Sequence, residues 1–139
     1  MATAEGCWVV YTDGASRGNP GPAAIGVVIF DDKDRECHRI SEAIGRATNN
    51  EAEYRAAIAG LEAALALGAR DVELRMDSEL VVRQLDSSYR VRNPRLKRLF
   101  ARMEDLRWRF ASFRATAIPR QENALADKLA NEALDRPGG

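Results

Sequence analysis

Hydrophobic positions in the first third of the chain come in short runs separated by turn residues. Residues 8–12 are β-branched or aromatic and are followed by Asp13-Gly14, so they predict a strand. Residues 25–30 form a second apolar run, and residues 31–34 after it are typical of a hairpin turn. A third strand, weaker in pattern, is expected over residues 36–43. Strands joined by such short turns predict an antiparallel meander.

The hydrophobic period becomes helical after residue 47. Thr48-Asn49-Asn50-Glu51 has the Ser/Thr-x-x-Glu form of a capping box, which marks the start of a helix. Ile58, Leu61 and Leu65 follow at helical spacing, and Gly68 is placed to end the helix.

The second half of the chain alternates between strands and helices. Residues 72–76 predict a half-buried strand, after which Asp77 or Ser78 can cap a short helix through Leu85. Asn93-Pro94 is a typical cap and first position of the next helix. The apolar stripe of that helix is expected to be Leu96, Leu99, Met103, Leu106 and Phe110. Residues 113–118 predict a last strand and residues 123–134 a last helix. The order β-β-β-α-β-α-α-β-α predicts an α/β fold, a mixed sheet flanked by helices, in one domain over residues 1–139.

Composition narrows the classes of function. The 21 basic and 21 acidic residues cancel, so only a local basic surface could bind nucleic acid. Cys7 and Cys37 are too few for a disulfide framework and lack the spacing of a metal motif, so we expect buried or unreactive thiols. No apolar run approaches the roughly 18 residues of a membrane span, and no signal-peptide pattern is present. We therefore expect a cytoplasmic protein that does not bind membranes.

Four acids stand near the ends of the predicted elements: Asp13, Glu53, Asp77 and Asp127. Asp13 and Asp77 are expected to end strands that can lie side by side, at the carboxyl edge of the sheet where sites usually form. Each acid also has a purely structural interpretation, as a turn residue, a helix cap, a partner of the helix dipole or a solvated side chain. Together, however, they offer the carboxylate oxygens that Mg²⁺ prefers. Two such ions about 3.5–4 Å apart can hold both the attacking and the leaving oxygen of a phosphodiester.

No other catalytic chemistry competes with this hypothesis. His38 is the only histidine, and we expect it to be a surface or structural residue of a strand. The chain contains no nucleophile elbow, phosphate-binding P-loop or dinucleotide-binding fingerprint.

Four stretches resemble the successive motifs of ribonuclease H type 1. They are residues 12–22 (TDGASRGNPGP), 47–53 (ATNNEAE), 76–78 (MDS) and 123–127 (NALAD), in the family's order and over nearly the whole chain. The resemblance implies a ribonuclease H-like fold, with a five-stranded mixed sheet in the order 3-2-1-4-5 whose first three strands are antiparallel. It also implies that Glu53, rather than Glu51 of the capping box, is the catalytic glutamate.

The activity implied by the resemblance is endonucleolytic hydrolysis of the RNA strand of RNA–DNA hybrids. Asp13, Glu53, Asp77 and Asp127 would be the catalytic residues and the ligands of two Mg²⁺ ions, which Mn²⁺ can replace in the family. The products would carry 5′-phosphate and 3′-hydroxyl ends.

The resemblance also assigns substrate contacts. Asn19, Asn49 and Asn50 match residues that contact RNA, including its 2′-hydroxyls, and such contacts distinguish RNA from DNA. Arg46 and Thr48 match a pocket for a phosphate of the DNA strand, although a loop arginine and a helix cap are the simpler interpretations.

The sequence departs from the family pattern in three places. A catalytic histidine is common before the last acid, but the short loop 118–122 has none. Arg120 of that loop could act on the leaving group or the product, although an arginine cannot be a general base. Glu79 stands where an uncharged residue often contacts RNA, which puts that contact in question. A basic protrusion is missing, and the nearby cations are Arg90, Arg92, Arg95, Lys97, Arg98 and Arg102. These six residues form either a solvated helix face or a local nucleic-acid-binding surface.

Two other functions remain possible from the sequence. A non-cleaving nucleic-acid-binding module of the same fold would be favoured by loss of an acid, and none is lost. A nuclease or recombinase that acts on duplex DNA is disfavoured by the Thr48-Asn49-Asn50 stretch. We expect a monomer.

Overall fold

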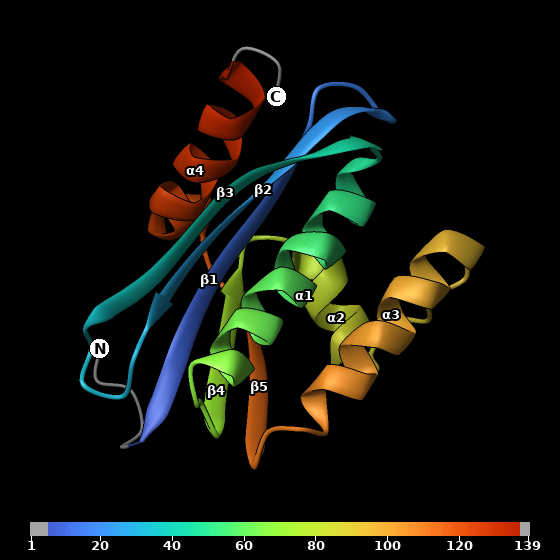
Figure 1. Ribbon diagram of the computed structural model, residues 1–139. Helices are drawn as coiled ribbons and strands as arrows, with labels where there is room; N and C mark the ends of the chain where they lie inside the picture. Colours follow the sequence, from blue (N-terminus) through green and yellow to red (C-terminus); the bar gives the residue numbers. More distant parts are fainter. Residues whose placement is uncertain (1–5, 137–139) are drawn as a thin grey trace.

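The computed structural model describes residues 6–136, which fold into five strands, four α-helices and one 3₁₀ turn (Figure 1). The elements are β1 (Cys7–Ser16), β2 (Gly21–Phe30), β3 (Glu36–Ala47), α1 (Asn49–Ala66), β4 (Asp71–Met76), α2 (Glu79–Leu85), α3 (Pro94–Arg107), β5 (Ser112–Ala117), η1 (Arg120–Asn123) and α4 (Ala124–Asp135). The predicted order of strands and helices is confirmed, with η1 added before the last helix.

The strands form one sheet in the order β3-β2-β1-β4-β5, as predicted. β2 pairs antiparallel with both β1 and β3, whereas β1, β4 and β5 run parallel to one another. The two parallel neighbours at the centre, β1 and β4, therefore end at the same edge of the sheet.

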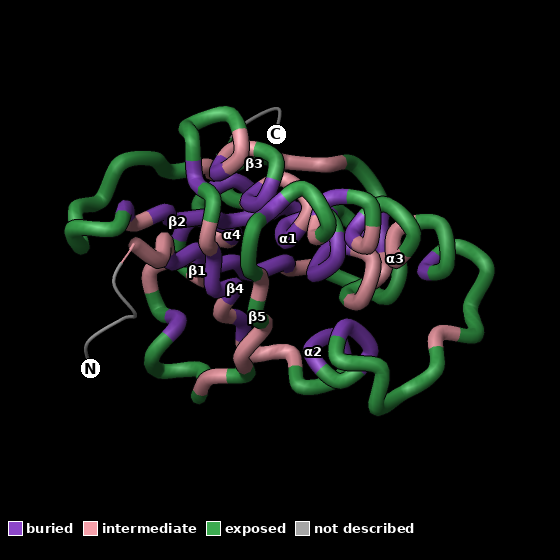
Figure 2. The backbone as a smooth tube through the Cα atoms, turned by 90° about the horizontal axis from the view of Figure 1, so that it is seen from below, coloured by how far each residue is buried: buried purple, intermediate pink, exposed green. Residues whose placement is uncertain are grey.

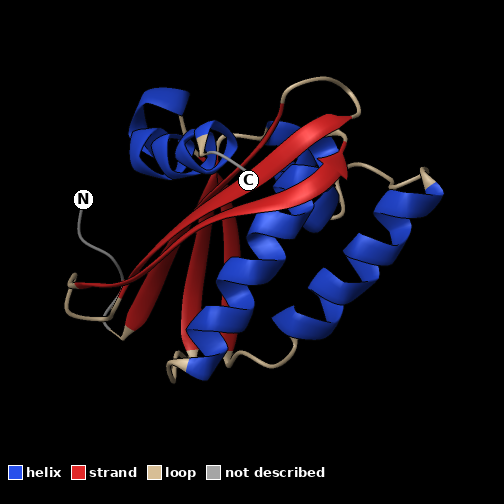
Figure 3. Ribbon diagram, turned by 45° about the horizontal axis from the view of Figure 1, so that its top comes forward, coloured by secondary structure: helices blue, strands red, loops and turns tan. Residues whose placement is uncertain are grey.

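Helices cover the two faces of the sheet unequally. α1 packs across β1 and β2 with α3 beside it, while α4 lies on the opposite face over β2 and β3 (Figures 1 and 3). The approach of α4 depends on Gly26, where an added Cβ would lie 2.0 Å from the backbone oxygen of Ala126. A glycine in β2 thus lets α4 lie close enough to bring Asp127 to the edge of the sheet.

Two helix starts follow the sequence closely. Thr48 caps α1, and the reciprocal hydrogen bonds of a capping box join it to Glu51. Asn93 caps α3 through its side chain, with Pro94 in the first turn. Of the two alternatives for α2, Ser78 is the cap, because its hydroxyl accepts from the Val81 N–H. Asp77 is therefore free of the capping role.

The strands are longer than the apolar runs that predict them. The prediction that β1 ends before Asp13 is wrong, because pairing with β2 continues through Asp13 and Gly14 to Ser16. β3 likewise continues to Ala47 by pairing with the small residues at the start of β2. Backbone pairing, rather than hydrophobic content, sets the length of both strands.

The core lies between the sheet and α1 to α3. Its fully buried side chains include Val10, Ile29, Leu61 and Leu74, and the buried backbone follows the centre of the sheet and the inner side of α1 (Figure 2). The predicted stripe is confirmed for α3 itself, because Leu96, Met103 and Leu106 are buried and Leu99 is partly buried against the same cluster. Phe110 is buried too, but it lies beyond the end of the helix at Arg107, so its place on the helix is a wrong prediction. None of the helices in residues 6–136 is long and apolar enough to cross a membrane.

Candidate active site

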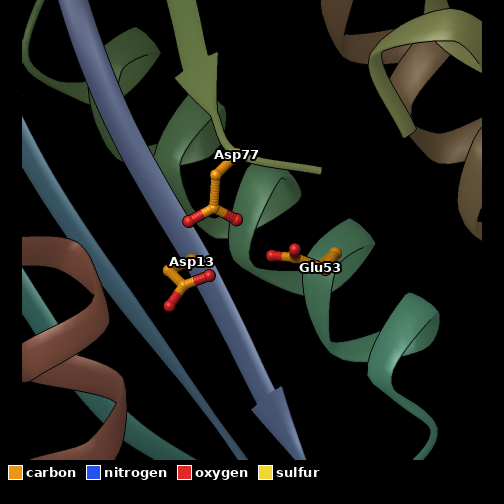
Figure 4. A group of neighbouring side chains, drawn as sticks. All are labelled: Asp13, Glu53 and Asp77. Atoms are coloured by element: carbon orange, nitrogen blue, oxygen red, sulfur yellow. The ribbon is translucent and has the colours of Figure 1, made fainter. Parts of the chain in front are cut away.

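Three carboxylates meet where β1 and β4 come to the same edge of the sheet. Asp13 comes from β1, Glu53 from α1, and Asp77 from the residue after β4 (Figure 4). Each of them offers one oxygen, and these oxygens all lie within 4.8 Å of one another. We call Asp13, Glu53 and Asp77 the acidic trio.

Strand register brings the two aspartates together. In the parallel β1–β4 pair, Tyr11 is the partner of Arg75. Asp13 and Asp77 each follow these partners by two residues, so they reach the same level on the same face of the sheet. The predicted meeting of the two residues above strands 1 and 4 is thereby explained by one pairing.

Glu53 reaches the trio because α1 lies directly on Gly14. An added Cβ at Gly14 would lie 2.2 Å from the carbonyl carbon of Ala52, so only glycine fits beneath the helix. The Gly14 N–H donates to Glu53 Oε1 over 2.7 Å, which fixes the carboxylate toward β1.

The trio is electrostatically costly without a counter-charge. Burial, followed by the charges of Glu53 and Asp77, raises the pKa of Asp13 to about 9. Burial and the charge of Asp77 raise the pKa of Glu53 to about 7, against the hydrogen bond from Gly14. Both side chains are more than nine-tenths inaccessible to solvent. A divalent cation would remove this repulsion.

Asp127 lies beside the trio rather than within it. It is partly buried near the start of α4, and its hydrogen bond and charge add to the raised pKa of Asp13. Its own carboxylate Oδ1 lies 3.3 Å from the amide Nδ2 of Asn131, and its backbone oxygen accepts from the same amide over 2.9 Å.

The four acids share one open cavity of about 320 Å³. The cavity is lined by Asp13, Gly14, Ala15, Ser16, Asn49, Glu53, Asp77, Arg120, Asp127 and Asn131. Arg120 is exposed in the 3₁₀ turn that leads into α4, so the loop that lacks a histidine contributes an arginine to the lining of this cavity.

The donor set suits a hard dication. All the side-chain ligands available from the trio and Asp127 are carboxylate oxygens, which Mg²⁺ and Mn²⁺ prefer over softer metals. The two thiols lie outside the cavity. Cys7 is partly buried and Cys37 is exposed, so for Cys37 only the alternative of an unreactive thiol remains, and it stays a prediction. His38 is exposed on β3, as expected for a surface residue.

Two of the three asparagines predicted to contact RNA, Asn19 and Asn49, are held by backbone amides. Asn49 Oδ1 accepts from the Ser16 N–H over 3.2 Å, and Asn19 Oδ1 accepts from the Asn49 N–H over 3.0 Å. Both carbonyl oxygens are thus occupied, which leaves the Nδ2 groups as donors on an exposed surface. Asn49 lines the acid cavity, whereas Asn19 and Asn50 line a neighbouring one.

The neighbouring cavity has a volume of about 550 Å³ and lies between the start of α1 and the start of α3. Its lining residues are Asn19, Thr48, Asn50, Glu51, Asn93, Pro94, Arg95, Leu96 and Arg98. Thr48 Oγ1 accepts from the Glu51 N–H over 3.2 Å as the helix cap. Arg46 is exposed outside the lining, and its Nη2 donates to the Pro20 oxygen over 3.4 Å.

The remaining substrate candidates are dispersed. Glu79 is exposed at the start of α2, 3.6 Å from Arg83, and does not line the acid cavity.

Of the six cations around α3, Arg95 and Arg98 line the neighbouring cavity, and Arg90 and Lys97 line a third. Arg102 is paired with Glu62 at 2.6 Å and Asp105 at 3.3 Å. Among residues 6–136, Arg95 and Arg98 near Thr48 form no ion pair, whereas Arg102 further along α3 is neutralised.

Two asparagines near the acids carried no role in the sequence prediction. Asn123 is buried; its Nδ2 donates to the Thr12 oxygen over 2.9 Å and lies 3.5 Å from Asp77 Oδ2. Asn131 contacts Asp127 as described above. The sequence does carry a signal for Asn131, namely its spacing of four residues from Asp127. Residues four apart share a helix face, and asparagine–aspartate pairs form there.

Comparison with known proteins agrees with this geometry. A family model described as "Reverse transcriptase-like" matches residues 11–133. A ribonuclease HI of Halobacterium salinarum is 50% identical over 125 residues, which are 90% of this chain and 63% of that protein. A bifunctional protein of Mycobacterium tuberculosis is 44% identical over 91% of this chain and 35% of its own length. The chain thus spans less than two thirds of these curated relatives.

Solved structures give the same assignment. The crystal structure of RNase H1 from Halobacterium salinarum superposes with a TM-score of 0.90 at 48% identity, covering 93% of this chain and 98% of that one. An RNase H1 isolated from compost, crystallised in complex with an RNA/DNA hybrid, gives a TM-score of 0.87 at 47% identity, covering 92% and 96%. Given the family model over residues 11–133 and an RNase H1 structure that is 48% identical with a TM-score of 0.90, the chain belongs to the ribonuclease H type 1 family.

Proposed function

We propose that this chain is a metal-dependent endonuclease that hydrolyses the RNA strand of RNA–DNA hybrids. The observation that carries the proposal is the acidic trio, built by β1, α1 and the end of β4 in a chain of this family. The RNase H1 from compost, which is 47% identical, was crystallised with such a hybrid.

Asp13, Glu53, Asp77 and Asp127 would hold two Mg²⁺ ions, or two Mn²⁺ ions. When bound, the metals supply an activated water and charge stabilisation for in-line attack on a phosphodiester. The chain's own contribution is preorganisation: Gly14 fixes Glu53, and the β1–β4 register fixes the two aspartates. Hydrolysis would leave 5′-phosphate and 3′-hydroxyl ends.

Arg120 would act on the leaving oxygen or the product phosphate. It is exposed and lines the same cavity as the four acids, so its guanidinium is available to an anion there. It would work by charge and hydrogen bonding, because an arginine does not give up a proton near neutral pH.

Selection of RNA would depend on Asn19, Asn49 and Asn50. Since backbone amides occupy the side-chain oxygens of Asn19 and Asn49, these two residues present N–H donors, which suit the oxygen of a 2′-hydroxyl. This orientation favours contact with RNA over DNA at the same position.

The DNA strand would lie over the neighbouring cavity. A backbone phosphate there would meet Thr48 and the cations Arg95 and Arg98, with Arg46 exposed nearby. Arg90, Arg92 and Lys97 would extend this surface as a short substitute for a basic protrusion. Glu79 would weaken rather than strengthen contact with the substrate backbone.

We also propose a monomer that works in a reducing cytoplasm, where free thiols such as Cys7 and Cys37 persist.

Labelled RNA–DNA, RNA–RNA and DNA–DNA duplexes, each incubated with Mg²⁺, Mn²⁺ or chelator, test the proposal. We expect cleavage of the RNA strand of the hybrid with either metal, none with chelator, and 5′-phosphate ends on the products. Binding of the hybrid without cleavage would instead support a non-cleaving module, and equal cleavage of DNA–DNA would reject hybrid specificity.

A further inference from the structure

Asn131 lies on α4, four residues after Asp127, and lines the cavity that holds the acids. Its Nδ2 donates to the backbone oxygen of Asp127 over 2.9 Å and lies 3.3 Å from the carboxylate Oδ1 of the same residue. Both side chains are partly buried. The Asn131 amide therefore contacts the Asp127 carboxylate where α4 brings that carboxylate to the cavity.

The other acids are held by different means. Glu53 accepts from the Gly14 N–H, and Asp77 lies near the buried amide of Asn123. Asp127 comes from the opposite face of the sheet, and its carboxylate is not part of the trio. Asn131 supplies an amide donor to the Asp127 carboxylate, which also has a contact with Asp13. Loss of that donor would remove one of the restraints on rotation of the Asp127 side chain.

We propose that Asn131 is a positioning residue that fixes the Asp127 carboxylate for its part in metal-dependent cleavage. This inference rests on the proposed function. A neutral amide suits the task, since it holds one carboxylate oxygen without competing, as a cation would, for the negative charge that attracts a metal. A carboxylate in its place would instead add repulsion to a site that is already overcharged.

Kinetics of the purified chain on labelled hybrid give the first test. At saturating Mg²⁺, Asn131→Ala should lower kcat about tenfold, the scale of one hydrogen bond to a charged group, and leave KM within about twofold. Asn131→Gln, which keeps the amide on a longer arm, should recover part of the loss, whereas Asn131→Asp should lose more than Asn131→Ala. Glu132→Ala, on the exposed side of the same helix, is the matched control and should behave as the parent.

A double-mutant cycle separates positioning from a general effect on α4. In the Asp127→Asn background, Asn131→Ala should cause no further fall in kcat, because the group that it positions has been changed. An undiminished tenfold loss in that background would overturn the proposal.

A spectroscopic readout makes the test independent of activity. In the ¹⁵N-labelled chain, the side-chain amide signals of Asn131, identified by their loss in Asn131→Ala, should move when Asp127 is replaced by Asn. They should also move on titration with Mg²⁺, and less so in Asp127→Asn. Signals that ignore both changes would overturn the role of Asn131 even if the parent cleaves hybrid. Cleavage by Asn131→Ala at a rate within twofold of an active parent would also overturn the role of Asn131. An inactive parent would instead reject the proposed function, and the spectroscopic test would then decide on the role of Asn131.

Discussion

The Gly14 N–H donates to Glu53 Oε1 over 2.7 Å, at a point where α1 lies directly on β1. This hydrogen bond joins the strand that carries Asp13 to the helix that carries Glu53. Because a Cβ at Gly14 would lie 2.2 Å from the Ala52 carbonyl carbon, the bond and the glycine depend on each other. This contact places Glu53 in the acidic trio, while the β1–β4 register places the two aspartates.

Gly14→Ala should therefore damage both stability and activity. The added methyl group meets backbone rather than a flexible side chain, so α1 must shift, at a cost of about 1–3 kcal/mol or more. Chemical denaturation should show a lower free energy of unfolding, and cleavage of hybrid should fall with it. A variant with parental stability and turnover would mean that α1 does not lie on β1 as described.

The metal-free protein should lose stability as the pH rises, through Asp13 and Glu53. Their folded pKa values, about 9 and about 7, lie above the ordinary values of 3.8 and 4.5, so the native state holds more protons than the unfolded state in between. The contribution of these groups to stability is complete at about pH 4 and is lost as the pH rises toward 9. Asp13→Asn cannot ionise and should escape part of this loss.

Thermal unfolding in chelator, at pH 5 and at pH 9, measures this effect. The stability of Asp13→Asn relative to the parent should increase by about 1 kcal/mol or more between the two pH values, since one pKa unit corresponds to about 1.4 kcal/mol. Mg²⁺ should shrink the difference by stabilising the parent. A difference in stability that is constant with pH would show that folding does not raise the pKa of Asp13.

The sequence carries a signal for some of the residues of this site and for some of the elements around it, but not for all. The four acids followed from motifs whose chemistry is local to the chain, and Thr48 and Asn93 followed from helix-capping patterns. The extension of β1 past Asp13 did not, because it depends on pairing with small residues of β2 that no hydrophobic period marks. Arg120 lines the cavity of the acids, whereas Arg102 is paired with Glu62, and this difference depends on tertiary contacts.

Removal of 2′-hydroxyls near the cleavage site should protect the hybrid. Asn19 and Asn49 present N–H donors, so each missing 2′-hydroxyl leaves a donor unsatisfied. A hybrid whose RNA strand carries 2′-deoxy residues around the scissile bond should be cut at about one tenth of the rate of the unmodified hybrid, or at a lower rate. The same substitutions placed far from the bond are the control, and equal rates for both substrates would contradict recognition through the 2′-hydroxyl.

Arg120→Ala should lower turnover by about 10²-fold, the scale for loss of one transition-state donor. The pH dependence of turnover should stay unchanged near neutrality, because arginine does not titrate there. Arg120→Lys keeps the charge but loses the planar fork, so it should recover part of the rate. Gln121→Ala, in the same 3₁₀ turn, serves as the control. Turnover of Arg120→Ala within twofold of the parent would show that Arg120 is a solvent-exposed residue with no role in the reaction.

The central claim is that the acidic trio acts through divalent metal on the RNA strand of a hybrid. Its most direct test is the rate of hybrid cleavage at saturating Mg²⁺ by the parent, Asp13→Asn and Asp77→Asn, with circular dichroism to confirm that each variant is folded. The account predicts rapid cleavage by the parent, its abolition by chelator, and no measurable cleavage by either folded variant. Substantial Mg²⁺-dependent cleavage by folded Asp13→Asn would contradict it.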